Sequence, residues 1–454
     1  MAHADLVILG GGSGGYACAL RAAELGKSVI LIDKDKLGGT CLHRGCIPTK
    51  ALLHAAEVAD SAKESDAFGV RATFEGIDMP KVNEYRDGVV GRLYKGLQGL
   101  VKSRNVTFVE GTGRLVGPKT IEVNGEQHTG DTIVLATGSY ARSLPGLEIT
   151  GRIMTSDQAL NLDYVPKRVI VLGGGVIGVE FASVWRSFGS EVTIVEGLPH
   201  LVPNEDEACS KALERAYRKR GIAFNLGVRF ASATQDDSGV HVSLEDGTVL
   251  DADLLLVAVG RGPNTAGMGY EEQGIAMDRG WVLVDERLRT NVPGVYAVGD
   301  ITPGLQLAHR GFQHGIFVAE EVAGLNPAVI ADVNIPRVTY CEPEVASVGL
   351  TEAKAKAAGY ELKVGRFPFL ANGKAIALGE DQGLIKTIFD AKTGRLLGAH
   401  MVGAEVTELI QGFVIAMGLE TTEEELMHTV FPHPTLSEMM HESVLDAYGR
   451  VIHM

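Results

Sequence analysis

Two cysteines separated by four residues are the most chemically suggestive feature of this sequence. Cys41 and Cys46 lie in the segment GGTCLHRGCIPTK. Outside secreted proteins, such a close pair indicates metal or redox chemistry more often than structural cross-linking. We expect Pro48 just inside the start of a helix, because its missing N–H costs nothing there. Cys46 would then lie near the N-terminus of that helix, where the helix dipole stabilises a thiolate.

Three interpretations of the cysteine pair compete. Half of a zinc site is the weakest, since no second CxxC or Cys/His pair offers the remaining ligands. Two unrelated buried thiols would need no explanation alone, but the Gly-Gly-Thr and Ile-Pro-Thr-Lys frame is unusual for them. We favour a redox-active disulfide and expect no bound metal.

An internal repeat indicates what lies next to that pair. Residues 5–33 and 168–196 each contain an apolar run, a glycine turn, a helix-length segment and a second apolar run that ends in an acid. The matching positions are Gly10, Gly12, Gly15 and Asp33 in the first copy, and Gly173, Gly175, Gly178 and Glu196 in the second. Each GxGxxG follows a strand and opens a helix, which is the arrangement that holds a pyrophosphate at a helix N-terminus. Each copy therefore predicts a β-α-β dinucleotide site rather than a glycine-rich turn.

The acid that ends each copy predicts how the ribose is bound. A carboxylate at this position accepts hydrogen bonds from the adenosine ribose hydroxyls. Glu196 would repel a 2′-phosphate, and no arginine follows it in VEGLPHL. The second site is therefore expected to prefer NAD over NADP.

The rest of the chain reads as alternating strands and helices. Helices are expected at 47–62 and 84–102, the second with Leu93, Leu97 and Leu100 on one face. Strand-like runs follow at 106–111, 119–123 and 131–138, with a boundary near Pro145–Gly146. The second copy extends to about residue 264, another strand ends in Gly-Asp at 300, and Pro336 opens a last segment of strands and helices.

Composition limits the class of protein. A length of 454 residues suggests roughly three domains. The net charge of −15 argues against nucleic acid or an anionic membrane surface as the main partner. The longest apolar stretch, residues 6–20, contains five glycines and is too short to span a bilayer. The N-terminus lacks a basic region of the signal-peptide type, so we expect a cytoplasmic protein.

Taken together, the motifs resemble those of the pyridine nucleotide-disulfide oxidoreductases over essentially the whole chain. The matching segments are GGGSGG, GGTCLHRGCIPTK, VLATGS, GGGVIGVEFAS, AVGRGPN, VYAVGD, LAH and HPTLSE. The resemblance implies an α/β fold with two Rossmann-like dinucleotide-binding domains, for FAD and NAD, and an α+β C-terminal dimerisation domain. The implied segments are 1–146 for FAD and the disulfide, 147–264 for NAD, 265–335 completing the FAD site, and 336–454 for a homodimer interface.

The resemblance also assigns residues to the FAD site. Asp33 would bind the adenosine ribose, and Gly113 would lie near the adenine. Asp300 would bind the ribityl chain, and the helix beginning at Ala308 would direct its amides towards the flavin. Lys50 would lie near the flavin.

Further residues are assigned at the NAD site and beside it. Lys50 is expected to pair with Glu180. Glu196 would bind the ribose of NAD, and Gly260 would line the nicotinamide side.

The remaining assignments concern the thiols and their base. The resemblance implies that Cys46 is the sulfur facing the flavin and that Cys41 exchanges with substrate. His433 and Glu438 lie five residues apart in HPTLSE. An imidazole suits proton transfer near neutrality, and a carboxylate partner holds its tautomer. His433 is therefore the expected catalytic base.

The implied activity is NAD-linked oxidation of dihydrolipoyl groups carried by the acyltransferases of 2-oxo acid dehydrogenase complexes. A glutathione-type reductase and a non-catalytic, FAD-holding assembly subunit are the alternatives. Two dipeptides depart from the family pattern. His43–Arg44 stands where Asn-Val is common, and Phe431–Pro432 precedes the histidine where His-Ala is frequent.

Overall fold

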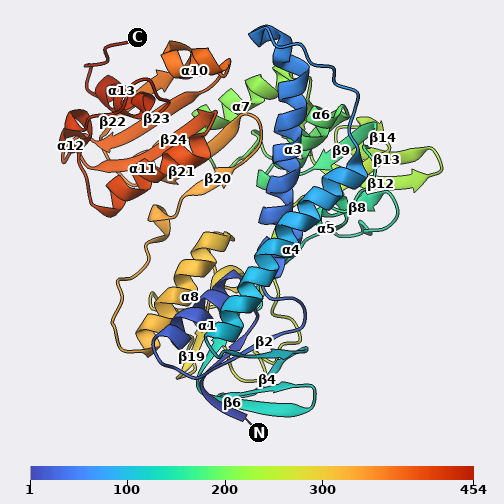
Figure 1. The fold of residues 1–454 in the computed structure, drawn as a ribbon, viewed down its shortest axis with the longest axis vertical. Coiled ribbons are helices and arrows are strands. Elements are labelled where there is room, and N and C mark those ends of the chain that lie inside the picture. Colours follow the sequence, from blue (N-terminus) through green and yellow to red (C-terminus); the bar gives the residue numbers. More distant parts are fainter. Residues whose placement is uncertain (1) are drawn as a thin grey trace. The chain divides into compact units, whose positions relative to one another are not determined.

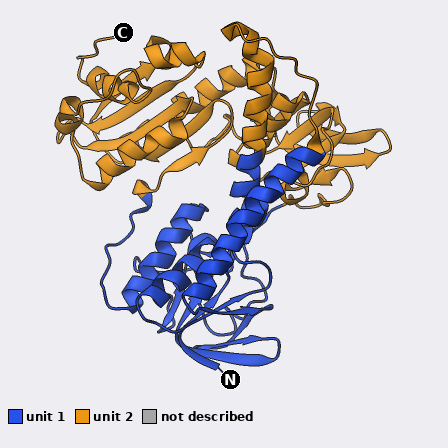
Figure 2. Ribbon diagram, in the orientation of Figure 1, with its two compact units in different colours: residues 1–51, 80–142, 260–332 blue, residues 52–79, 143–259, 333–454 orange. Residues whose placement is uncertain are grey.

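The computed structural model describes residues 2–454 (Figure 1). Its contacts divide the chain into two compact units (Figure 2). Each unit is assembled from three separate stretches of sequence. Unit 1 contains the chain up to Ala51, Pro80–Arg142 and Gly260–Asp332, whereas unit 2 contains Leu52–Met79, Ser143–Val259 and Val333–Met454. The division into 1–146, 147–264, 265–335 and 336–454 stays a prediction.

The main sheet of unit 1 contains the first repeat. Its strand order is β3-β2-β1-β6-β5-β4, and β19 pairs with β6. The pairs β1–β2, β1–β6, β2–β3 and β6–β19 are parallel, whereas β4–β5 and β5–β6 are antiparallel. The strands are β1 (Ala2–Leu9), β2 (Val29–Asp33), β3 (Thr107–Glu110), β4 (Arg114–Gly117), β5 (Thr120–Val123), β6 (Glu126–Leu135) and β19 (Val295–Ala297).

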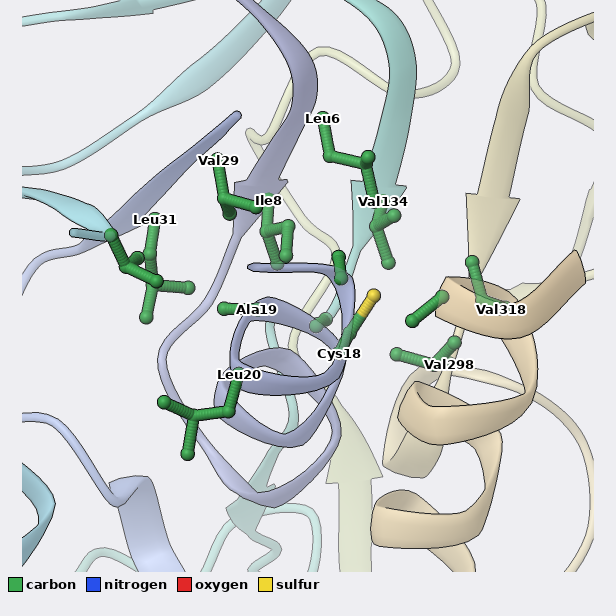
Figure 3. Close-up of a cluster of buried hydrophobic side chains, with 14 of the residues drawn as sticks. Leu6, Ile8, Cys18, Ala19, Leu20, Val29, Leu31, Val134, Val298 and Val318 are labelled. Carbon is green, nitrogen blue, oxygen red and sulfur yellow. The ribbon is translucent and has the colours of Figure 1, made fainter. Parts of the chain in front are cut away.

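Two helices cover one face of this sheet. They are α1 (Ser13–Glu24), which connects β1 to β2, and α8 (Ala308–Val322). Leu6, Ile8 and Val134 from the strands meet Cys18 of α1 and Val318 of α8 in one buried cluster (Figure 3). The apolar runs of the parallel strands are therefore explained by burial under helices.

The second repeat forms a parallel sheet in unit 2. Its order is β11-β10-β9-β15-β8, and all of its pairs are parallel. The elements are β8 (Ile153–Met154), α5 (Ser156–Ala159), β9 (Arg168–Leu172), α6 (Val176–Phe188), β10 (Glu191–Glu196), α7 (Glu207–Lys219), β11 (Ala223–Leu226) and β15 (Leu254–Val257). An antiparallel sheet follows α7, with β12 (Phe230–Asp236), β13 (Gly239–Leu244) and β14 (Val249–Ala252). The predicted pair of β-α-β units is confirmed.

The C-terminal part of unit 2 is an α+β domain, as predicted. Its antiparallel sheet has the order β20-β21-β24-β23-β22. The strands are β20 (Arg337–Thr339), β21 (Glu344–Gly349), β22 (Leu362–Pro368), β23 (Leu384–Asp390) and β24 (Leu396–Gly403). The helices are α9 (Glu352–Ala357), α10 (Gly373–Leu378), α11 (Val406–Gly418), α12 (Glu423–His428) and α13 (Glu438–Ala447).

Two long helices lie between the repeats in sequence, α3 (Cys46–Glu64) and α4 (Met79–Ser103), as predicted. Leu93, Leu97 and Leu100 share one face of α4 by their spacing, as predicted, but only part of that face is buried. Leu97 is buried, but Leu93 and Leu100 are 46% and 47% exposed. The stripe that packs on the core contains Tyr94, Leu97 and Val101, so it is rotated around the helix axis. None of the helices in residues 2–454 is long and apolar enough to cross a membrane.

Gly365 tests the packing of the helix that begins at Glu438. A methyl group on this β22 residue would lie 1.7 Å from the Ser443 carbonyl oxygen on α13. We expect Gly365→Ala to lower the free energy of unfolding by about 1–3 kcal/mol, measured by thermal or urea denaturation. Gly373→Ala, whose added methyl meets open space, is the control and should not destabilise the protein. Equal stability of the two variants would contradict this packing.

Candidate active site

The first glycine turn brings backbone against backbone. Gly10 has φ +111°, and a methyl group there would lie 2.1 Å from the Ala136 carbonyl oxygen. A methyl on Gly15 would lie 1.7 Å from the Gly10 carbonyl oxygen. Gly12 is the N-cap of α1 and makes no side-chain cap, so the first N–H groups of the helix are available to a ligand.

The acid that follows is held by the turn itself. Asp33 accepts hydrogen bonds from the Gly11 N–H at 2.5 Å and the Asp35 N–H at 2.8 Å. Burial raises the pKa of Asp33 despite these bonds. A pocket lined by Gly10, Asp33 and Gly113, among others, opens beside it. A glycine cradle, a fixed carboxylate and an adjoining pocket fit the adenosine and pyrophosphate of FAD.

The second glycine turn repeats this geometry in unit 2. Gly173 has φ +112°, and a methyl on Gly178 would lie 1.9 Å from the Gly173 carbonyl oxygen. Glu196 accepts hydrogen bonds from the Gly174 N–H at 2.7 Å and the Leu198 N–H at 2.8 Å. The carboxylate therefore occupies the position that would meet a ribose.

Gly175 is the N-cap of α6, as Gly12 is of α1. Like its counterpart, Gly175 makes no side-chain cap. The first N–H groups of both helices are thus arranged alike, and the residues of the second turn fit a dinucleotide as well as those of the first.

The two cysteines meet at the junction of two helices. Cys41 lies on α2 (Gly39–Arg44), and Cys46 is the first residue of α3, as the position of Pro48 predicts. A hydrogen bond with Cys46, together with burial, raises the pKa of the Cys41 thiol. The two sulfurs are therefore neighbours in the dithiol form. Lys50, one turn further along α3, opposes this rise with its charge.

The cysteine pair also faces α1. Burial, followed by the charges of Cys41 and Cys46, raises the pKa of Tyr16 to about 12. The Ser13 hydroxyl hydrogen-bonds to Cys41 and lowers the pKa of that thiol. Tyr16 and Ser13 were not predicted from the sequence, although their place in the first turns after the glycine motif could have indicated them.

The three isolated cysteines differ from this pair. Cys18, Cys209 and Cys341 are all buried. Burial raises the pKa of each of these thiols, which keeps them protonated and unreactive.

A second cluster in unit 1 surrounds Asp300. This residue lies in a 3₁₀ turn, Gly299–Ile301, directly after β19. Its carboxylate accepts a hydrogen bond from the Ser139 hydroxyl at 2.6 Å, and Ser139 Oγ accepts from Arg261 Nε at 2.8 Å. Ser139 and Arg261 were not predicted, although each lies in a motif segment, VLATGS and AVGRGPN.

Two further predicted residues, Gly260 and Ala308, lie close in sequence to members of the Asp300 cluster. Gly260, with φ +104°, precedes β16 (Arg261–Pro263), which pairs with β7 (Ser139–Ala141). A helix begins at Ala308, as expected, and its N-cap residue Leu307 forms no side-chain cap.

The histidine and its carboxylate partner lie in unit 2. His433 Nδ1 is 2.8 Å from Glu438 Oε1, while Glu438 Oε2 accepts from the Thr435 N–H at 2.8 Å. Burial opposes the charge on Glu438, but the bonds from Thr435 and His433 hold its pKa below the usual value. The His433 side chain is 79% exposed. The carboxylate therefore fixes one ring nitrogen and leaves Nε2 to act on a ligand.

Phe431, the first of the two unusual residues before this histidine, has a packing role. The ring of Phe431 stacks on His441, with 5.4 Å between the centroids, and His441 Nε2 donates to the Met427 carbonyl. Phe431 therefore packs the segment that precedes His433 against α13.

Glu180 is buried on α6 and accepts a hydrogen bond from the Tyr340 N–H at 2.9 Å. Lys50 belongs to unit 1 and Glu180 to unit 2. Their pairing stays a prediction.

Chemically, unit 1 joins a dithiol, a lysine and a dinucleotide pocket, which suits transfer of an electron pair. Unit 2 carries a second dinucleotide turn and an exposed histidine–carboxylate pair, which suits hydride exchange and proton transfer.

Comparisons with known proteins agree with this chemistry. Residues 4–315 match the model of the pyridine nucleotide-disulphide oxidoreductases, and residues 335–444 match the dimerisation domain of the same family. A dihydrolipoyl dehydrogenase of Rhizobium etli is 46% identical, with 99% of this chain and 98% of the relative covered. The corresponding protein of Zymomonas mobilis is 45% identical, with 99% of both chains covered.

Solved structures show the same relationship. LpdA of Mycobacterium tuberculosis superposes with a TM-score of 0.90 at 28% identity, covering 98% of this chain and 99% of that one. The HOCl-induced flavoprotein disulfide reductase RclA of Escherichia coli gives 0.87 at 30% identity, covering 97% and 99%. The dithiol beside a dinucleotide turn, the second turn and both family matches lead to one conclusion: the chain belongs to the pyridine nucleotide-disulphide oxidoreductases.

Proposed function

We propose that this chain is a flavoprotein that oxidises dihydrolipoyl groups on acyltransferase carrier proteins and passes the electrons to NAD. The observation that carries the substrate class is the nearly full-length similarity to dihydrolipoyl dehydrogenases at 45–46% identity. FAD belongs in the first dinucleotide site and NAD in the second.

The chemistry begins at the cysteine pair. In the oxidised enzyme, one substrate thiolate attacks Cys41, so that a substrate–Cys41 mixed disulfide forms, the Cys41–Cys46 bond breaks and Cys46 leaves as a thiolate. The second substrate sulfur then attacks the substrate sulfur of the mixed disulfide and releases Cys41. Lipoyl disulfide leaves, and the two electrons remain on the enzyme dithiol. Bound FAD supplies the relay that transfers this electron pair to NAD⁺, giving NADH.

His433 acts as the general base in these steps. Its Nδ1 is held by Glu438, so Nε2 is the nitrogen that accepts the substrate thiol proton. Glu438 remains ionised because Thr435 and His433 lower its pKa, and it stabilises the protonated imidazole. His433 and Glu438 lie inside the matched dimerisation domain, which supports a homodimer that shares its sites.

Two further points complete the proposal. Lipoyl groups on the acyltransferases of 2-oxo acid dehydrogenase complexes are the physiological partners. A functional dithiol and three buried thiols fit a reducing compartment, so the cytoplasm is the proposed location.

A substrate panel tests the reaction. With NADH, lipoamide should give kcat/KM at least about a hundredfold above glutathione disulfide, since recognition differs between the two disulfides. Cys41→Ser should abolish disulfide turnover while FAD stays bound, which shows that the variant is folded. Efficient reduction of glutathione disulfide with NADPH would instead favour the glutathione-type alternative.

Glu196 is expected to determine the nicotinamide cofactor. Glu196→Arg replaces repulsion of a 2′-phosphate by a charge-assisted bond worth about 2 kcal/mol, so the NADPH/NADH ratio of kcat/KM should rise about thirtyfold. Glu196→Gln, which removes only the repulsion, should give a smaller rise. A wild-type enzyme that uses NADPH as well as NADH would show that the role given to Glu196 is wrong.

A mixed dimer tests whether two chains share each site. One chain carries Cys41→Ser and its partner carries His433→Gln. If the histidine acts on the partner's disulfide, both lesions fall in one site, and about half of the wild-type activity persists. Near-zero activity from a verified, FAD-loaded mixed dimer would place both groups of each site on one chain.

A further inference from the structure

The two unusual residues between the cysteines are anchored to a loop of the dinucleotide site. Arg44 Nη1 lies 2.9 Å from Asp35 Oδ2. His43 Nε2 donates to the Leu37 carbonyl at 2.8 Å, and its ring lies edge-on to Tyr94 with 5.0 Å between centroids. Both side chains are therefore engaged with unit 1 elements other than the dithiol.

The loop that both residues contact, residues 33–38, is fixed by hydrogen bonds at each of its ends. Its first residue, Asp33, is bonded to the N–H groups of Gly11 and Asp35. At its other end, the Gly38 N–H donates to the Gly11 carbonyl at 2.8 Å. Asp33 and Lys34 line the pocket assigned to FAD. The loop 33–38 is thus a continuation of the first dinucleotide turn.

Helix α2 depends on such anchors for its position. It has six residues, and its N-cap residue Gly38 forms no side-chain cap. A helix this short is not stable by itself. Leu42 packs with Leu37 in the same buried cluster, and a methyl on Gly39 would lie 2.8 Å from Gly12 Cα. Packing and the two polar anchors together determine where α2 places Cys41.

We propose that His43 and Arg44 are positioning residues, which fix α2 to the dinucleotide-binding loop 33–38 and thereby hold Cys41 against Cys46. This rests on the proposed redox role of the cysteine pair. It assigns a function to both residues of the His43–Arg44 departure from the family pattern.

The position of Cys41 can be followed through the pKa of its thiol, because that pKa depends on the groups around it. The groups that face this thiol are Cys46 and Lys50 on α3, and Ser13 and Tyr16 on α1. The hydrogen bond with Cys46 and burial keep the pKa of Cys41 high. The charge of Lys50 and the hydrogen bond from Ser13 lower this pKa by less than those two effects raise it. If α2 loosens, the larger raising effects are lost, and we expect the pKa of Cys41 to fall.

The test is the pH dependence of Cys41 alkylation in the holoenzyme. The FAD-loaded protein is reduced with dithiothreitol, desalted anaerobically and labelled with iodoacetamide, and Cys41 labelling is followed by peptide mass spectrometry. His43→Asn and Arg44→Val should each lower the pH midpoint by about one unit. Below both midpoints, that shift makes alkylation about tenfold faster.

The sign of the shift separates positioning from a simple charge effect. Removal of a nearby positive charge would by itself raise the pKa of a thiol. A lower midpoint in Arg44→Val therefore reports movement of α2. His43→Asn gives the same readout through the other anchor. Asp35→Asn breaks the ion pair from the opposite side and serves if Arg44→Val does not fold.

Matched variants complete the experiment. Arg168→Val is the control, because Arg168 is paired at 3.0 Å with Asp253 and is 45% exposed, against 46% for Arg44. It should leave the midpoint unchanged, and Arg44→Lys should restore the wild-type profile.

Three results would overturn the proposal: unchanged midpoints in the anchor variants, a raised midpoint in Arg44→Val, or an equal fall in Arg168→Val. Because dithiothreitol supplies the electrons, the measurement stands even if lipoamide proves not to be the substrate.

Discussion

Backbone-to-backbone contact at the first glycine turn is the constraint on which unit 1 depends. A methyl on Gly15 would lie 1.7 Å from the Gly10 carbonyl oxygen, so α1 packs against β1 only without a side chain there. The same helix start meets α2, where Gly39 approaches Gly12, and α8, where a methyl on Gly315 would lie 2.2 Å from the Gly14 carbonyl oxygen. The first glycine turn, α2 and α8 therefore lie close together because the start of α1 has no side chain at any of these three contacts.

The second β-α-β unit has the same glycine turn as the first, but its helix α6 makes different contacts from α1. On α6, Glu180 accepts from the Tyr340 N–H, and Ser183 Oγ accepts from the Glu342 N–H. The corresponding positions of α1 are the small or apolar Ala17 and Leu20. Polar groups on α6 thus satisfy backbone at the start of the C-terminal domain, whereas α1 buries apolar surface. One local motif serves two different packing tasks.

Short-range features could be predicted from the sequence, and long-range ones could not. The glycine turns, the start of α3 and the spacing of His433 and Glu438 all depend on neighbours a few residues away. Arg261 and Ser139 are 122 residues apart, and neither has a local signal for the other. The part of the leucine face of α4 that is buried could not be predicted for the same reason, since the core partners of Leu97 come from distant strands and helices. The bonds from Gly11 to Asp33 and from Gly174 to Glu196 show that each acid also rigidifies its turn, a role that spacing alone does not reveal.

Buried ion pairs explain why residues 143–259, which contain the second dinucleotide turn, belong to the same compact unit as the C-terminal sheet. Lys386 on β23 is 2.7 Å from Asp206, the N-cap of α7, and 2.7 Å from Glu352. Burial opposes the charge on Asp206, but Lys386 holds its pKa below the usual value.

Arg337 on β20 pairs with Glu205 at 2.9 Å, and both side chains are largely buried. Loss of either partner would leave an uncompensated charge, so these pairs resist separation even where they add little net stability. The partners are 132 and 180 residues apart, which places them outside any division drawn along the sequence. These ion pairs therefore hold the second dinucleotide-binding segment against the C-terminal domain that carries His433, because separating the two would leave buried charges without partners.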